Sequence, residues 1–122
     1  MEQILVVGLG GFLGAVARYK LGGLVLHHTE RFKFPVSTFA VNVLGCFIAG
    51  ILAGLVEKHD FFDPKARLLL FTGLLGGFTT FSAFGLETVS LLQRQEFFWA
   101  ALYILLSVLI GILALWSGIK IV

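Results

Sequence analysis

Four long apolar stretches, separated by short polar connectors, dominate the pattern of this chain. The stretches cover residues 4–26, 36–56, 66–92 and 97–119, and the connectors cover residues 27–33, 57–65 and 93–96. A helix needs about 20 apolar residues to cross a bilayer, so each stretch is long enough to span it. The connectors are too short to fold separately. The pattern therefore predicts an all-α membrane protein with four transmembrane helices in a single domain, residues 1–122.

The third stretch departs from a simple membrane helix at its centre. Between residues 68 and 92 the only charged side chain is Glu87, yet residues 76–87 include paired glycines, paired threonines, a serine and three phenylalanines. Glycine and threonine weaken a helix, and a charge in lipid costs at least about 2.5 kcal/mol. Irregular polar backbone survives at membrane depth only where protein buries it or where it lines a water-filled path. We therefore expect this helix to be broken mid-membrane and to form part of a permeation pathway.

Composition agrees with the membrane class and argues against several others. Hydrophobic residues make up 58% of the chain and charged residues 13%, against about 25% charged residues in a soluble domain. The net charge of +2 comes from dispersed Lys and Arg, which fits contact with lipid headgroups and gives no basic block for nucleic acid. Cys46 is the only cysteine, and the sequence offers no nucleophile–base pair or metal-ligand cluster. We therefore do not expect an enzyme.

The cations are distributed almost evenly between the two membrane faces. With four crossings, one face carries four cations and the opposite face carries five: Lys58, Lys65, Arg67 and Lys120 against Arg18, Lys20, Arg31, Lys33 and Arg94. An excess of Lys and Arg normally fixes orientation, so this chain has little orientation bias. Either copies insert both ways and pair antiparallel, or a weak bias or another protein still sets one topology.

Two polar residues within the apolar stretches each allow two interpretations. Arg18 follows the apolar residues 4–17, and it either snorkels to the interface or forms an electropositive vestibule that attracts anions. Asn42 lies near mid-membrane, with Thr38 one turn earlier on the same helical face. A buried amide must be hydrogen-bonded, so Asn42 either bridges helices or faces a wet path, where its NH₂ group suits an anion.

A narrow stripe of polar and small residues marks the fourth stretch. Tyr103, Ser107 and Gly111 recur every four residues and so share one face of a helix. Such a stripe has no use against lipid, and it indicates either helix packing or pore lining. Trp99 and Trp116 lie near the two ends of the stretch and fit interfacial anchors.

Taken together, these segments resemble a known family. The sequence Gly-Gly-Phe-Thr-Thr-Phe-Ser-Ala-Phe-Gly-Leu-Glu at residues 76–87 closely resembles the signature of the CrcB/Fluc fluoride channels. The similarity extends to Gly-Ala-Val-Ala-Arg ending at Arg18, to Ser-Thr-Phe-Ala-Val-Asn ending at Asn42 and to the stripe from Tyr103. The resemblance implies a bacterial inner-membrane protein that forms an antiparallel, dual-topology homodimer. It also implies a passive, fluoride-selective channel that exports fluoride from the cytoplasm and so relieves its toxicity.

The resemblance implies a role for each matching residue. Phe81 and Phe84 look like the paired rings that line the fluoride path, with Asn42 as the hydrogen-bond donor beside them. The rest of the pathway matches further polar positions: Thr38, Ser82, Glu87, Tyr103, Ser107 and the vestibule residue Arg18. Gly76 and Thr79 match the helix break whose backbone carbonyls, from both subunits, hold a structural Na⁺ on the two-fold axis.

Several alternatives stay open at this point. Ala83 and Gly111 stand where relatives carry hydroxyl side chains, so the resemblance does not assign the outer part of the polar track there. Glu87 is a protonated donor to fluoride, an ionised group that repels it, or an acid at the membrane edge paired with a cation such as Arg94. The main alternative function is a small proton-coupled multidrug exporter that uses Glu87, and the third is a hydrophobic assembly subunit without transport.

Overall fold

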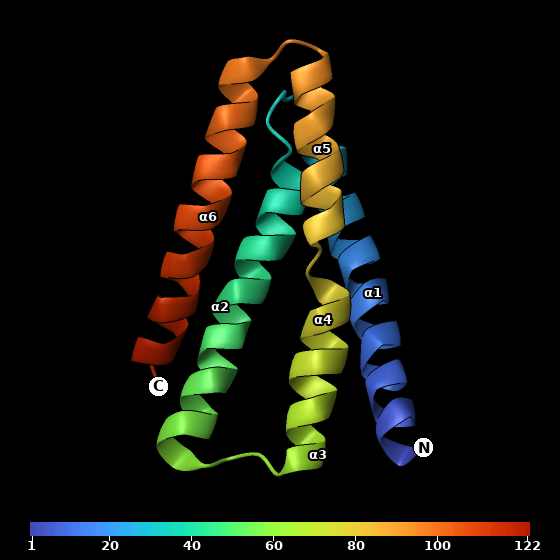
Figure 1. Ribbon diagram of the computed structural model, residues 1–122, viewed down its shortest axis with the longest axis vertical. Helices are drawn as coiled ribbons and strands as arrows, with labels where there is room; N and C mark the ends of the chain where they lie inside the picture. Colours follow the sequence, from blue (N-terminus) through green and yellow to red (C-terminus); the bar gives the residue numbers. More distant parts are fainter.

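Four helical columns make up the structure, a computed structural model that describes residues 1–122 (Figure 1). Helix α1 covers Glu2–Thr29, α2 covers Val36–His59 and α6 covers Phe97–Lys120. The third column contains four successive elements: α3 Pro64–Arg67, the π-helix η1 Leu68–Leu75, α4 Gly76–Phe78 and α5 Phe81–Gln93. The prediction of four membrane-length helices is confirmed, and the third helix is interrupted as expected.

Several helices extend beyond the predicted apolar stretches. α1 begins at Glu2, and α2 continues through the polar residues 57–59. Long charged side chains reach water while their backbone stays helical, so hydrophobicity marks the membrane-embedded part of a helix and not its end. α2 ends at Asp60, which adopts the left-handed conformation (φ 48°) and donates its N–H to the carbonyl of Val56, a common way to end a helix.

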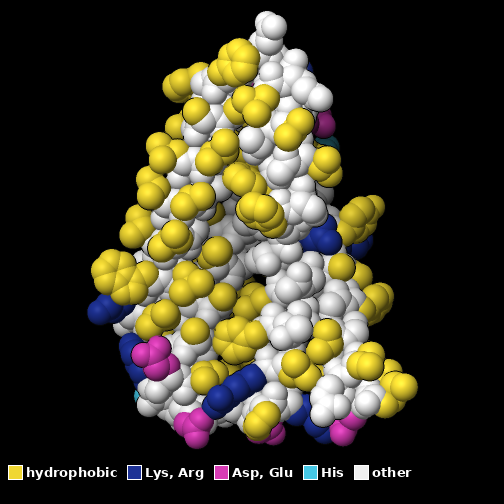
Figure 2. All heavy atoms as spheres, viewed as in Figure 1, with side chains coloured by type: hydrophobic (Ala, Val, Ile, Leu, Met, Phe, Trp, Pro, Cys, Tyr) yellow, Lys and Arg dark blue, Asp and Glu magenta, His cyan; other side chains and the backbone are white.

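The connections alternate between the two ends of the bundle. Both chain ends and the connector from α2 to α3 lie at one end, and the connections from α1 to α2 and from α5 to α6 lie at the other (Figure 1). Apolar side chains cover the length of the bundle, and charged side chains gather at the end that carries the termini (Figure 2). Only 15 of 122 residues are buried within the single chain, and many large apolar side chains face outward. The chain is therefore a multi-pass membrane protein.

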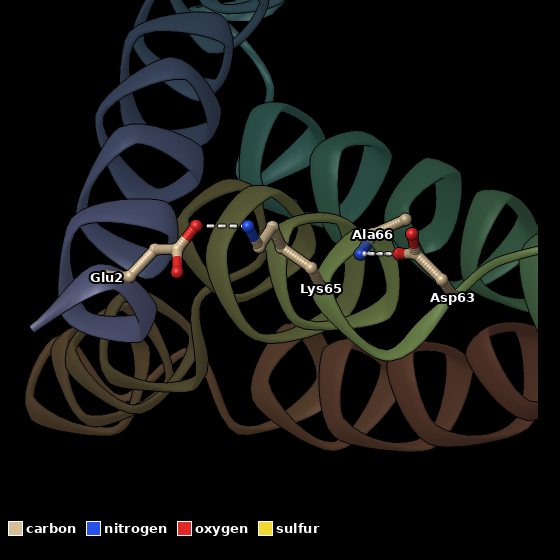
Figure 3. A network of polar contacts seen from close by, with 4 residues as sticks. All are labelled: Glu2, Asp63, Lys65 and Ala66. Carbon is tan, nitrogen blue, oxygen red and sulfur yellow. Dashed lines mark hydrogen bonds and ion pairs between the residues drawn. The ribbon is translucent and has the colours of Figure 1, made fainter.

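Local polar contacts fix the start of the third column (Figure 3). The Oδ1 atom of Asp63 accepts the N–H of Ala66 at 2.7 Å, and Pro64 occupies the first helical position. Both residue types are favoured there, because the carboxylate satisfies a free N–H and proline has no N–H to satisfy. Lys65 forms an ion pair with Glu2, which joins α3 to the start of α1.

α1 and the third column approach until their backbones touch. A Cβ atom added at Gly10 would lie 2.6 Å from the carbonyl oxygen of Leu69 and 2.9 Å from the Cα atom of Gly73. A Cβ atom at Gly77 would lie 2.6 Å from the carbonyl oxygen of Gly11. Small residues permit this approach, and close packing is a main source of helix association in lipid. The glycines thus hold η1 and α4 directly against α1.

Gly10→Ala is expected to destabilise the folded chain by about 1–3 kcal/mol, the usual cost of overpacking, because its methyl group meets backbone atoms that cannot rotate away. Gly8→Ala is the matched control, since a Cβ atom at Gly8 has no neighbour within 4 Å and alanine favours a helix by about 0.5–1 kcal/mol. Thermal unfolding in detergent, followed by circular dichroism, measures both variants. Equal midpoints for the two would contradict the close backbone contact.

α2 and α6 form a second close pair, again through glycines. A Cβ atom at Gly118 would lie 2.8 Å from the backbone nitrogen of Ile51. α5 packs on the start of α6, where the buried cluster consists of Leu91, Ala100 and Tyr103. α4 packs mainly on α1, and α5 packs mainly on α6. The two halves of the broken helix therefore have different neighbours, and the break lies between them.

Candidate functional site

The break in the third column consists of two extended residues. Thr79 has φ −88° and ψ 154°, and Thr80 has φ −147° and ψ 116°. The first half-helix ends when the N–H of Thr79 reaches the carbonyl of Leu75 at 2.9 Å, and α5 begins at Phe81. The N–H of Thr80 is the first to leave the i→i−4 pattern, and the backbone groups at the break therefore need other partners.

Asn42 on α2 provides two of these partners. Its Oδ1 atom accepts the N–H of Thr80 at 2.8 Å, and its Nδ2 atom donates to the carbonyl of Thr80 at 3.0 Å. In a continuous helix these two groups would bond to the carbonyl of Gly76 and the N–H of Phe84. Asn42 therefore bridges helices, and it also lines the cavity described below.

Thr80 itself caps the second half-helix. Its Oγ1 atom accepts the N–H of Ala83 at 3.1 Å, and it lies 3.2 Å from the Oγ atom of Ser82. In a continuous helix the N–H groups of Thr80 and Ala83 would bond to the carbonyls of Gly76 and Thr79. Here these N–H groups bond to the side chains of Asn42 and Thr80, so the two carbonyls lose their helical donors. Gly76 and Thr79 are the same two residues that the resemblance associates with a cation.

A cavity of about 450 Å³ opens beside the break, between α2, the third column and α6. Figure 2 shows this face of the molecule hollowed near the middle of the bundle. Five of the predicted site residues line the cavity together: Asn42, Gly76, Thr79, Phe81 and Phe84. The rings of Phe81 and Phe84 have centroids 5.6 Å apart and planes inclined by 36°. Phe81 is 84% exposed, so little in this single chain covers its ring.

A second polar group lies further along α5, around Glu87. Its Oε2 atom accepts from the hydroxyl of Thr38 at 2.9 Å, and its Oε1 atom accepts from the hydroxyl of Tyr103 at 3.1 Å. The Tyr103 ring is fully buried and lies 5.0 Å, centroid to centroid, from that of Phe84. Tyr103 therefore connects the first cavity to the group around Glu87. Glu87 has no ion pair with Arg94, which instead donates to the carbonyl of Ser90 at 3.4 Å.

The remaining predicted residues lie at the edges of this arrangement. The Oγ atom of Ser107, one turn beyond Tyr103 on α6, is buried and has no hydrogen-bond partner. Gly111 faces Cys46 on α2, where an added Cβ atom would lie 3.5 Å from the sulfur. Ser82 is exposed. The stripe on α6 thus serves helix packing at Gly111, whereas Ser107 keeps an unused polar atom.

Arg18 lies against the first half of the broken helix. It is half-buried, and its Nε atom donates to the carbonyl of Gly77 at 3.1 Å. It also lines a second cavity of about 280 Å³ together with Thr38, Thr80 and Ala83. The sequence had not identified the contact to Gly77 or the roles of Thr80. A threonine directly before a helical segment is an N-cap signal, which was the available indication for Thr80.

The fold and the site together define a class of protein. A membrane-spanning helix is broken beside cavities that polar side chains line in part, as in proteins that carry ions or solutes across a bilayer. The sequence model of the family described as CrcB-like protein, Camphor Resistance (CrcB), matches residues 5–119. The chain therefore belongs to the CrcB family, and the resemblance seen at residues 76–87 is confirmed.

Several curated relatives are named "Fluoride-specific ion channel FluC". The relative from Methylobacillus flagellatus is 50% identical over 122 residues, covering 100% of this chain and 95% of the relative. The one from Flavobacterium psychrophilum is 44% identical over 119 residues, covering 98% and 95%. The one from Chlorobium phaeobacteroides is 46% identical over 117 residues, covering 96% and 90%. Their names describe ion channels and not enzymes.

Proposed function

We propose that this chain is a fluoride-selective passive channel that exports fluoride from the cytoplasm across a bacterial inner membrane. One observation carries the proposal: Phe81, Phe84 and Asn42 line a single cavity at the break of a membrane helix. This occurs in a chain that is 50% identical to a protein named as a fluoride-specific ion channel.

The chemistry of that cavity suits a small anion. An aromatic ring carries positive charge at its edge, so two inclined rings offer an anion favourable contacts without a full cation. Asn42 adds a hydrogen-bond donor, because one Nδ2 hydrogen is used by Thr80 and the other has no partner in the chain. Contacts of this kind are weak enough for the ion to leave, as conduction requires.

Beyond the rings, hydroxyl groups continue the path. Thr38 and Tyr103 both donate to Glu87 in this structure, and each hydroxyl can rotate to donate to a passing fluoride instead. Ser107, whose Oγ atom has no partner, supplies a further donor along α6. When no fluoride is beside them, Glu87 accepts the hydrogen bonds of Thr38 and Tyr103 and holds both hydroxyl groups in place.

A second copy in the opposite orientation completes the site. The single chain leaves Phe81 84% exposed and frees the carbonyls of Gly76 and Thr79 at the same cavity. Backbone carbonyls cannot remain without partners in lipid, and the near-even distribution of cations permits insertion in both orientations. An antiparallel homodimer would bring two such breaks together and give two equivalent fluoride paths.

The freed carbonyls also fit a structural Na⁺. Carbonyl oxygens are suitable ligands for an alkali cation, since they replace its hydration shell. A site on the two-fold axis would take the carbonyls of Gly76 and Thr79 from each subunit. When bound, the cation would satisfy four carbonyl oxygens that membrane lipid cannot.

Ion efflux from liposomes that contain the purified protein tests this function. A fluoride electrode and a parallel chloride assay record release after the membrane potential is clamped with valinomycin. Rapid fluoride release with little chloride release is expected, and protein-free liposomes provide the background. No fluoride release from protein that elutes as a single folded species would contradict the channel function. A response that depends on a proton gradient and a cationic drug would instead indicate an exporter that uses Glu87.

A further inference from the structure

The carbonyl of Gly77 occupies a special position at the break. In a continuous helix it would accept the N–H of Phe81, four residues later. In this structure the Nε atom of Arg18 donates to it at 3.1 Å. This is the only hydrogen bond that the Arg18 side chain makes, and it forms no ion pair. Arg18 therefore occupies the Gly77 carbonyl, which would otherwise accept the N–H of Phe81 and continue the first half-helix.

Packing between α1 and α4 fixes the place from which Arg18 reaches. A Cβ atom at Gly77 would lie 2.6 Å from the carbonyl oxygen of Gly11 and 3.2 Å from the backbone nitrogen of Ala15. Arg18 follows Gly11 by about two helical turns and therefore lies on the same face of α1. Backbone contact on that face sets the distance between the two elements, and the guanidinium group spans it.

The charge of Arg18 adds to the geometry. Gly77 belongs to the last residues of the first half-helix, where the carbonyls carry the negative end of the helix dipole. A cationic donor is favoured at such an end, and a hydrogen bond from a charged donor is stronger than one between neutral groups. Asn42 holds Thr80 from α2, and Arg18 holds Gly77 from α1. The break is therefore held from both sides.

We propose that Arg18 is a positioning residue that keeps the third helix broken, by occupying the Gly77 carbonyl and so setting the direction of Phe81. This role rests on the proposed channel function, since Phe81 lines the fluoride path. It differs from a role for Arg18 as a charge that attracts anions, in which any cation at this position would serve. The two roles depend on different atoms of the side chain and can be separated.

Three substitutions separate the donor from the charge. In Arg18→Gln the Nε2 atom is bonded to Cδ, as the Nε atom of arginine is, so a neutral donor remains at the same position along the side chain. Arg18→Lys retains the charge but places a methylene group there. Arg18→Met removes both the donor and the charge. Fluoride efflux from liposomes is measured for all three at low and at high ionic strength, using protein that elutes as the wild type does.

The positioning role predicts that Arg18→Gln retains a rate within about threefold of the wild type, whereas the Lys and Met variants lose about tenfold or more, as a lost hydrogen bond from a charged donor allows. High salt should not change this order. The opposite order, with Lys retained and Gln lost and the difference shrinking at high salt, would overturn the proposal in favour of anion attraction. Equal loss in Gln and Met would also overturn it.

Hydrogen exchange gives a second measurement that does not depend on transport. If Arg18 keeps the helix broken, the Met variant frees the Gly77 carbonyl to accept the Phe81 N–H, and exchange over residues 76–84 should slow. The Gln variant should exchange as the wild type does. Unchanged exchange in the Met and Lys variants would overturn the proposal. Wild-type protein without fluoride flux would contradict the channel function alone, since the exchange result stands independently.

Discussion

Phe81→Ile and Phe84→Ile are each expected to reduce fluoride efflux by about tenfold, because isoleucine has no positive ring edge to meet the anion and an aromatic edge contact is worth about 0.5–1.5 kcal/mol. Both rings line the cavity at the break. Phe81 is mostly exposed in the single chain, so its replacement should leave the fold of that chain intact. Phe84 is half-buried against Tyr103, so a small loss of stability should accompany the loss of flux.

Phe98→Ile is the matched control for these two variants. Phe98 lies on α6, contacts Trp99 edge to face and lines neither of the cavities at the break. Its replacement removes one exposed ring from a membrane helix and should leave efflux unchanged. Liposome efflux with the fluoride electrode compares the three variants. Wild-type rates in both Phe81→Ile and Phe84→Ile would remove the ring-edge mechanism, even if the protein conducts fluoride.

Asn42→Leu is expected to lower fluoride efflux close to the protein-free background and to lower the thermal stability as well. Leucine has a similar size but no hydrogen-bonding group, so the N–H of Thr80 loses its partner and the carbonyl of Thr80 loses the Asn42 donor. Each unsatisfied buried backbone group costs about 1–3 kcal/mol. The third helix then gains most by re-forming backbone bonds across the break, which would displace Phe81 and withdraw the free amide hydrogen from the cavity.

Two further variants identify which part of the amide matters. Asn42→Asp keeps an acceptor for the Thr80 N–H but places an oxygen against the Thr80 carbonyl and a negative charge beside the anion path, so conduction should also fail. Lys58→Met is the control on the same helix, because it removes one hydrogen bond, to the carbonyl of Ile119, and Lys58 lines neither of the cavities at the break. Efflux at the wild-type rate in Asn42→Leu would show that Asn42 neither holds the break nor meets the ion.

The sequence was sufficient to predict the four membrane helices and the place of the break. Long apolar runs are enough to identify spanning helices, and the glycine and threonine pairs mark where helix formation is weakest. The π-helix of η1 was not predicted, because its Leu-rich sequence is equally compatible with an α-helix. The backbone of η1 lies directly against the glycines of α1, a tertiary contact that the sequence of η1 alone does not indicate.

The partners of the polar residues were harder to predict, because they lie far apart in the chain. Asn42 and Thr80 are separated by 38 positions, and Thr38 and Glu87 by 49. A pairing of Glu87 with a cation such as Arg94 was one alternative for an acid at the membrane edge, but α5 ends at Gln93 and Arg94 donates to the carbonyl of Ser90. Spacing indicates only neighbours on one helix, whereas this site is assembled from four.

Backbone contact between α1 and η1 also determines how the molecule can move. Packed helices shear past one another by repacking flexible side chains, and the glycine faces of α1 and the third column have none to repack. α1, η1 and α4 should therefore move as a single rigid body, without a hinge or a sliding surface among them. A transporter that alternates between inward-open and outward-open states needs such a surface. A standing path that ions cross while this body stays still needs none.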